Sequence, residues 1–215
     1  MGSILEGKTL AALGDSLIYG NLLGNEKTWV NLLGRKHHMK VFNYGINGNP
    51  VAVQEKEPER IPMCIRYQDM TKDADYVVIL GGANDKRLDV PIGECSFSNR
   101  DTRTFMGALN TLIEGVTGRS PKARLLLMTN YNRWPQKNRL GLSDLDYVDA
   151  MIKAGELWSV PCFDNYRNCG LSFQNPAQLS WIDEGLSMGL QENHHFSPEA
   201  YEWLVDKYQV VLEGL

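Results

Sequence analysis

Short apolar runs alternate with longer amphipathic stretches along this chain, and no internal repeat or low-complexity tract interrupts the alternation. The clearest run is Tyr76–Leu80, whose continuous apolar character is expected of a central parallel strand that is buried on both faces. Alternation of this kind is typical of βαβ units, in which each helix brings the chain back to start the next parallel strand. We therefore predict an α/β fold, specifically a three-layer α/β/α sandwich with a five-stranded parallel sheet.

The expected elements follow from the spacing of apolar residues and from the residues that start or stop helices. Strands are expected at residues 9–13, 41–44, 76–80, 125–128 and 160–163. Helices are expected at residues 28–36, 59–70, from 101 or 102 to 118, 143–158 and 198–212. Loops are expected at residues 86–100, 130–141 and, with a helical turn or two, 165–196. The helix starts at 143 and 198 are well marked, by a capping-box pattern and by a Ser-Pro-Glu sequence.

Size and charge narrow the function classes. The chain has 215 residues and a formal net charge of −4, so we expect one domain over residues 1–215. No basic stripe is present, and nucleic acids and anionic membranes are therefore poor partners. No apolar run approaches the ~20 residues needed to span a bilayer. The first residues do not resemble a signal peptide, so a cytoplasmic location is expected, although a secreted domain stripped of its signal would look the same.

Polar residues follow three of the predicted strands, and a histidine precedes the last predicted helix. Ser16, Gly48 and Asn84 follow the first three strands, and His195 lies just before the helix start at 198. Because the carboxyl ends of parallel strands share one edge of a sheet, where ligands bind, the three strand ends can converge. Taken singly, each is ordinary, since a serine after a strand is usually a helix N-cap and the other two segments are typical of turns.

Four short blocks place these residues in a known pattern. The blocks are Gly14-Asp15-Ser16-Leu17, Asn43-Tyr44-Gly45-Ile46-Asn47-Gly48, Gly82-Ala83-Asn84-Asp85 and His195-Phe196-Ser197-Pro198-Glu199. Their order and spacing over residues 14–199 resemble those of the GDSL, or SGNH, hydrolases, which include GDSL-like lipases and acylhydrolases. The family is named for a Ser, a Gly, an Asn and a His. The resemblance implies a flavodoxin-like SGNH hydrolase fold.

The resemblance also implies a mechanism. Ser16 is the expected nucleophile and His195 the base that takes its proton, because a serine hydroxyl alone is a poor nucleophile. The expected oxyanion hole consists of the backbone N–H groups of Ser16 and Gly48 and the side-chain amide of Asn84. The predicted function is that of a serine esterase or acylhydrolase, which cleaves carboxylic esters through an acyl-enzyme. Short acyl esters, acetylated sugars, lysophospholipids and thioesters are all open as substrates, and the oligomeric state is open too.

One departure from the family pattern concerns the acid that orients the histidine. The family usually has an Asp three residues before the histidine, and this chain has Glu192 there. We expect Glu192 to orient His195, with Asp183 or a backbone carbonyl as alternatives, since Ser-His-Glu triads exist on other folds. His194 is the second choice for the base. The departure leaves open a second function, that of a non-catalytic carbohydrate- or lipid-binding protein on the same scaffold.

Other residues near the expected site have supporting or open roles. Asp15 and Asp85 are expected to brace the loops through hydrogen bonds. Trp134 and Trp181 lie in loops that should overhang the catalytic edge, either to stack on a substrate or to pack within the protein. The pair His194-His195 has no second ligand cluster at a suitable spacing, so we expect neither a metal nor a cofactor.

Overall fold

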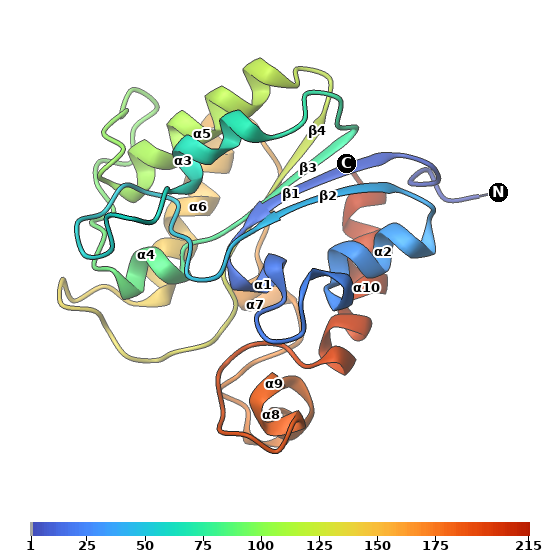
Figure 1. Cartoon of the computed structure of the whole chain (residues 1–215). Helices are drawn as coiled ribbons and strands as arrows, with labels where there is room; N and C mark the ends of the chain where they lie inside the picture. The colour runs from blue at the N-terminus through green and yellow to red at the C-terminus, as the bar shows by residue number, and fades with distance from the viewer. Residues whose placement is uncertain (1) are drawn as a thin grey trace.

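A five-stranded sheet lies at the centre of the computed structural model, which describes residues 2–215 (Figure 1). The strand order is β2-β1-β3-β4-β5, and every neighbouring pair is parallel. The strands are β1 (Thr9–Gly14), β2 (Lys40–Gly45), β3 (Tyr76–Leu80), β4 (Arg124–Met128) and β5 (Cys162–Phe163). The predicted five-stranded parallel sheet is thus confirmed, although β5 is shorter than expected.

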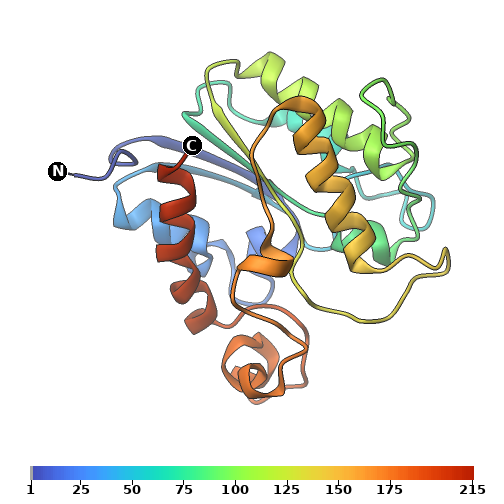
Figure 2. The same cartoon turned by 180° about the vertical axis from the view of Figure 1, so that it is seen from behind.

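Alternate residues of the strands face opposite layers of helices, as the two-residue period of a strand requires. In β1, Leu10 and Ala12 belong to one hydrophobic core, whereas Ala11 and Leu13 belong to the other. The helices that cover these two cores are α2 (Trp29–Lys36) and α10 (Pro198–Glu213) on one side, and α5 (Phe105–Arg119) and α6 (Asp144–Trp158) on the other. Figures 1 and 2 show the two pairs of helices on opposite faces of the sheet. The three-layer α/β/α sandwich is therefore confirmed.

Two of the long helices begin where the sequence predicts. The side chain of Ser197 accepts a hydrogen bond from the N–H of Ala200 at 3.1 Å, which satisfies one of the free donors at the start of α10. The helix α6 opens with a capping box between Ser143 and Asp146. Both predicted starts are confirmed.

The start of α5 differs from the expectation that Asp101 or Thr102 caps it. The N-cap is Thr104, whose hydroxyl accepts from the N–H of Gly107 at 3.2 Å. The Asp101 carboxylate instead accepts from the N–H of Arg103 at 3.0 Å, closing a turn of its own. An aspartate that caps such a local turn cannot cap the helix that follows it.

The predicted helix over residues 59–70 is wrong in extent. Only α3 (Met63–Arg66) is α-helical, and a 3₁₀ turn, η2 (Tyr67–Asp69), follows it. Pro62 explains the late start, because it is the N-cap, has an extended backbone and disfavours a helical conformation in the residue before it. The Arg66 guanidinium donates to the carbonyl of Tyr44 at 2.7 Å and to Oδ1 of Asn49 at 2.6 Å, which fixes this segment to the loop after β2.

Short helices occupy several of the segments that connect the strands and the long helices. They are α1 (Ser16–Tyr19), η1 (Asn25–Lys27), α4 (Ala83–Arg87), α7 (Asn165–Asn168), α8 (Pro176–Ile182) and α9 (Glu184–Ser187). Thus α4 takes the first residues of the loop expected at 86–100, and α7 to α9 supply the helical turns expected in 165–196. Both views show α8 and α9 below the N-terminal end of α10 (Figures 1 and 2). In the described residues, no helix has the length and apolarity that crossing a membrane requires.

Candidate active site

Ser16 lies at the point where β1 gives way to α1. Gly14 ends the strand, and a Cβ there would overlap the side chain of Ile18, so glycine lets α1 pack closely over the strand end. The carboxylate of Asp15 accepts from the N–H of Leu17 at 2.9 Å and caps the short helix. Ser16 is consequently the first helical residue, and its exposed fraction is 5%.

His195 reaches Ser16 from the other end of the chain. Its Nε2 lies 2.8 Å from Ser16 Oγ, and its Nδ1 lies 2.8 Å from the main-chain oxygen of Asn193. Because a carbonyl oxygen can only accept, Nδ1 must hold the proton in the neutral imidazole, which leaves a lone pair on Nε2. The hydroxyl of Ser16 therefore donates to Nε2. This is the geometry in which an imidazole can act as a base toward a serine.

Asp183 holds the loop that presents this imidazole. It is fully buried, and its carboxylate accepts from the N–H groups of Asn193, at 3.1 and 3.2 Å, and of His194, at 2.7 Å. His194 has a φ of +54°, in the left-handed region that L-residues seldom adopt. The side chain of Asn193 accepts from the N–H of His195 at 3.1 Å. The loop thus turns tightly enough to bring the Asn193 carbonyl within hydrogen-bond distance of Nδ1 of His195.

The expectation that Glu192 orients His195 is wrong in this structure. The Glu192 carboxylate lies 2.7 Å from Nδ1 of His194, because the left-handed backbone of His194 turns the chain so that this imidazole, and not that of His195, meets the carboxylate. Asp183, the first alternative, binds backbone N–H groups and not the imidazole. The second alternative, a backbone carbonyl, is the group that faces Nδ1. His194 itself has ring contacts with Trp134 and Phe173, with centroids 5.3 and 5.7 Å away.

The side-chain amide of Asn84 is fixed from both ends. Its Nδ2 donates to the Asp15 carboxylate at 3.2 Å, and its Oδ1 accepts from Nε of Arg87 at 3.2 Å. The amide nitrogen therefore points toward the residue that precedes Ser16, and one of its two hydrogens remains for another acceptor. Asn84 is buried, with an exposed fraction of 8%.

The loop that contains Gly48 is held next to the end of β1. The N–H of Ile46 donates to the carbonyl of Gly14 at 3.1 Å. Gly48 has a φ of +71°, a backbone conformation that favours glycine. Among the described residues, the backbone N–H groups of Gly48 and Ser16 have no hydrogen-bond acceptor.

Asp85 connects this loop to α4. Its buried carboxylate accepts from the N–H of Val51, at 3.0 and 3.1 Å, and from the N–H of Ala52 at 2.9 Å. Burial raises the pKa of Asp85 to about 7 and also raises the pKa of Asp15. The two aspartates that were expected to brace the loops thus accept from loop and helix N–H groups, whereas the hydroxyl of Ser16 bonds to His195.

The electrostatics of the site favour a neutral imidazole. Burial, followed by the nearby Arg133 guanidinium, lowers the pKa of His195 to about 3. Arg133 is itself buried, with an exposed fraction of 2%, and stacks on the ring of Trp134 at 4.0 Å. No sequence pattern marked Arg133. Only its place in the loop after β4, close to the other strand ends, could have pointed to it.

Glu184 is a second residue that the sequence did not reveal. It is fully buried, and its carboxylate accepts from Asn21 at 2.7 Å, from the N–H groups of Leu22 and Leu23 at 3.0 and 3.1 Å, and from Asn193 at 3.0 Å. It therefore joins the segment after α1 to the loop of His195. Trp181, in contrast, packs on Trp203 and the hydrophobic core. Within residues 2–215, no group of three or more His, Cys, Asp or Glu side chains is placed to hold a metal ion.

A family model covers most of the chain, including all four motif blocks. It is that of the GDSL-like lipase/acylhydrolase family, and it matches residues 12–203. The chain belongs to this family. Membership in the GDSL-like lipase/acylhydrolase family supports acylhydrolase activity in general, and it confirms the resemblance on which the fold and the hydrolase class were predicted.

Solved structures agree with the fold. One is 30% identical, with a TM-score of 0.86, and the match covers 100% of this chain and 99% of that one. A protein from Lactobacillus plantarum is 26% identical, with a TM-score of 0.82 and coverage of 97% and 98%. The aryl esterase of M. smegmatis, in an inhibitor-bound form, is 14% identical, with a TM-score of 0.68 and coverage of 97% and 99%, a likeness of fold alone. No curated protein matches this chain in sequence.

Proposed function

We propose that this member of the GDSL-like lipase/acylhydrolase family is a serine esterase that hydrolyses carboxylic esters through an acyl-enzyme. The observation that carries the proposal is the 2.8 Å hydrogen bond between Ser16 Oγ and His195 Nε2. The match to the family model supports the proposal, as does the likeness to an aryl esterase of the same fold.

In the first step, Ser16 Oγ attacks the ester carbonyl while its proton passes to Nε2 of His195. The resulting imidazolium then gives that proton to the departing alkoxide, which leaves as the alcohol. A water molecule then attacks the acyl carbonyl and gives a proton to Nε2 of His195. That proton passes to Ser16 Oγ as the bond between Oγ and the acyl group breaks, which releases the carboxylic acid and restores the serine. Throughout, the Asn193 carbonyl accepts from Nδ1 and keeps the ring in the tautomer that the reaction needs.

The negative charge that develops on the carbonyl oxygen requires donors that are already in place. The N–H groups of Ser16 and Gly48 and the free hydrogen of the Asn84 amide are the proposed donors. Asp15 and Arg87 orient the Asn84 amide, and Asp85 holds the loop after Gly48. The donors therefore need little reorganisation when the oxyanion forms.

A fluorophosphonate probe tests the proposal directly, because only an activated serine reacts with it. We expect the wild-type protein to be labelled at Ser16, and Ser16→Ala and His195→Ala to remain unlabelled. A series of p-nitrophenyl esters of increasing chain length, run with the same variants, gives the acyl preference. Hydrolysis that persists in Ser16→Ala would refute the assignment. A wild-type protein that takes no label and cleaves no ester would favour the binding protein without turnover.

A further inference from the structure

A pocket of about 450 Å³ opens beside the proposed oxyanion hole. Its charged lining residues are the cations Lys56, Lys86, Arg87, Lys137 and Arg139 and the single carboxylate Asp89. The chain as a whole has a net charge of −4, so an excess of positive charge on one pocket is a local feature and not a consequence of composition.

The pocket touches the proposed site on two sides. Ala83 lines it and directly precedes Asn84, and Arg87, which also lines it, donates from Nε to Oδ1 of Asn84 at 3.2 Å. On the other side the wall is Trp134, whose ring lies 5.3 Å from that of His194. A group bound in this pocket therefore lies next to Arg87, which contacts the oxyanion donor Asn84, and next to Trp134, which contacts the histidine loop.

Three of the five cations already have carboxylate partners. Lys86 lies 3.3 Å from Asp144, and Lys56 forms an ion pair with Asp89. Arg87 donates to both oxygens of Glu57, at 2.7 and 3.1 Å. These hydrogen bonds are the main reason that the pKa of Glu57 falls to about 2, so Glu57 is ionised at neutral pH.

The side-chain cations of the other two residues, Lys137 and Arg139, are exposed and form no ion pair within 4.0 Å among residues 2–215. The main-chain N–H of Arg139 donates to the Asp89 carboxylate at 2.8 Å, and that carboxylate forms its ion pair with Lys56. The charge of Lys137 contributes to lowering the pKa of Asp146. The Asp146 carboxylate nevertheless bonds to Ser143, accepting from its N–H at 2.7 Å and from its hydroxyl at 2.6 Å. Two positive charges on the pocket wall are consequently available to an anion from solution.

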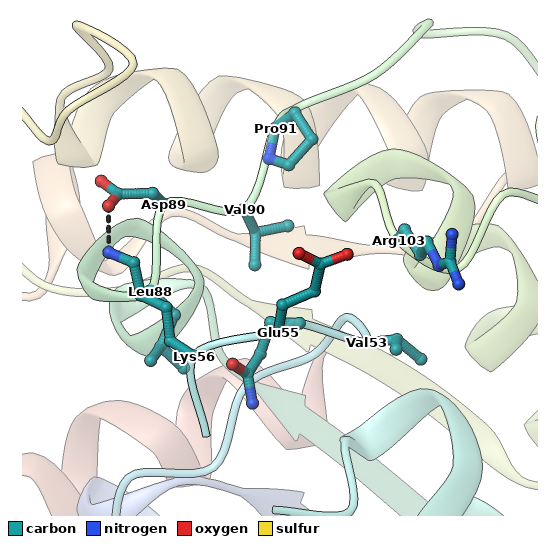
Figure 3. Close-up of a pocket in the computed structure, with 9 residues that line it drawn as sticks. Val53, Glu55, Lys56, Leu88, Asp89, Val90, Pro91 and Arg103 are labelled. Atoms are coloured by element: carbon teal, nitrogen blue, oxygen red, sulfur yellow. Dashed lines mark hydrogen bonds and ion pairs between the residues drawn. The ribbon is translucent and has the colours of Figure 1, made fainter. Parts of the chain in front are cut away.

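The adjoining cavity provides a contrast (Figure 3). It has a volume of about 330 Å³ and shares Lys56 and Asp89 with the first pocket, and Figure 3 shows the ion pair between these two side chains. Its remaining charged residues are Glu55 and Arg103, so its two cations balance its two carboxylates. Of these two pockets, only the one beside Asn84 therefore has an excess of positive charge.

Trp134 gives the cationic pocket a rigid apolar wall. Its main-chain N–H donates to Asp144 at 3.1 Å, and its main-chain carbonyl accepts from Lys86 at 3.0 Å. Its ring stacks on the buried Arg133 guanidinium at 4.0 Å. A wall of this kind suits the carbon skeleton of a substrate, while the cations suit a charged end.

We propose that the ester substrates of this protein carry an anionic group, such as a carboxylate, and that Lys137 and Arg139 attract it into the pocket beside Asn84. The inference rests on the proposed acylhydrolase function and narrows its substrate class. The anionic group can belong to the acyl portion or to the alcohol portion of the ester, and these two sources are separated below.

Two matched pairs of esters test the proposal. In the acyl pair, 4-nitrophenyl hydrogen adipate is compared with 4-nitrophenyl hexanoate. In the alcohol pair, 4-acetoxybenzoate is compared with 4-acetoxybenzamide, each corrected for its hydrolysis without enzyme. We expect the wild-type kcat/KM to favour the charged member of one pair by about tenfold, and we expect that ratio to decrease as salt screens the charges.

The double variant Lys137→Ala/Arg139→Ala should bring that ratio close to one. A ratio of two esters measured on the same sample is independent of the fraction of folded protein, so a loss of stability cannot imitate the result. Arg103→Ala, which removes an exposed cation from the adjoining cavity, is the matched control and should leave the ratio unchanged.

Equal rates for the charged and neutral members of both pairs would overturn this proposal while leaving the acylhydrolase proposal intact. A charge preference that survives in the double variant would also overturn it. Failure of the wild-type protein to hydrolyse any of the four esters would overturn the acylhydrolase proposal, and this one with it.

Discussion

The main-chain oxygen of Asn193 lies 2.8 Å from Nδ1 of His195, in the place where a carboxylate is usual in a serine hydrolase triad. A carbonyl dipole fixes the tautomer and the direction of the ring, but it lacks the full charge that stabilises an imidazolium. The orientation of the base therefore depends on the backbone of the loop. Two buried carboxylates hold that loop: Asp183 accepts from its backbone N–H groups, and Glu184 accepts from the side-chain amide of Asn193.

Glu192→Gln should change kcat/KM little, by less than about threefold. The Glu192 carboxylate contacts His194 and not His195, whereas removal of an acid that does orient the imidazole costs roughly 10⁴-fold in turnover. Hydrolysis of p-nitrophenyl acetate and the rate of fluorophosphonate labelling are the measurements. A loss of a hundredfold or more would show that Glu192 turns toward His195 during the reaction.

Asp183→Asn should be the damaging substitution in this loop. One of the carboxylate oxygens that accept from Asn193 and His194 would become an amide donor facing an N–H group. We expect kcat to decrease by about tenfold or more, and the free energy of unfolding to decrease by about 1–3 kcal/mol. Denaturant unfolding and ester kinetics measure the two effects. A variant with wild-type kcat would mean that the loop holds the imidazole without this carboxylate.

Asn84→Ala should reduce turnover by roughly a hundredfold or more, because an oxyanion donor contributes about 3 kcal/mol to the transition state. The effect should appear in kcat more than in KM, since the oxyanion exists only in the transition state and the intermediate. Arg87→Gln, which removes the group that orients the amide, should have a smaller effect in the same direction. A loss confined to KM in Asn84→Ala would argue against an oxyanion role.

The sequence was sufficient to predict the sheet and the meeting of Ser16 with His195. The first three motif blocks lie at the ends of short apolar runs, and parallel topology brings such ends to one edge. The block of His195 follows a long loop, and the resemblance to the family implied its place beside Ser16. Capping residues such as Ser143 and Ser197 act within a few residues of themselves, so the helix starts that they mark were also predictable. Local rules of this kind need no knowledge of the tertiary structure.

The failures have a different physical origin. The partner of Nδ1 depends on the left-handed backbone of His194, and the residue type alone does not predict that conformation. Glu184 bonds to Leu22 and Leu23 across more than 160 positions of sequence, and no periodicity records such a contact. The segment 59–70 has helical spacing of apolar residues, yet its helix starts only after the extended Pro62, and Arg66 ties the short helix to Tyr44 and Asn49.

The pH dependence of activity should reflect the environment of His195. The base must be neutral to accept the proton of Ser16, and burial together with Arg133 lowers its pKa to about 3. His195 is therefore protonated only at a lower pH than an ordinary histidine. We expect kcat/KM for a neutral ester to stay level from about pH 8 to about pH 5, with no decrease to half its value near pH 6.5. Arg133→Met should move the acid limb to higher pH, because a cation that opposes the imidazolium is removed. An acid limb centred near pH 6.5 in the wild-type protein would contradict this.

Glu184→Ala should destabilise the protein by about 3 kcal/mol or more, because it leaves the buried donors of Asn21, Leu22, Leu23 and Asn193 without their acceptor. Glu184→Gln retains one acceptor oxygen and should lose about half as much. Glu26→Ala is the matched control, since its carboxylate pairs with Arg35 at the surface and should contribute less than about 1 kcal/mol. Denaturant midpoints give all three values. If Glu184→Ala matched Glu26→Ala, the segment after α1 and the histidine loop would be held by other contacts, and the placement of His195 over Ser16 would not depend on this buried carboxylate.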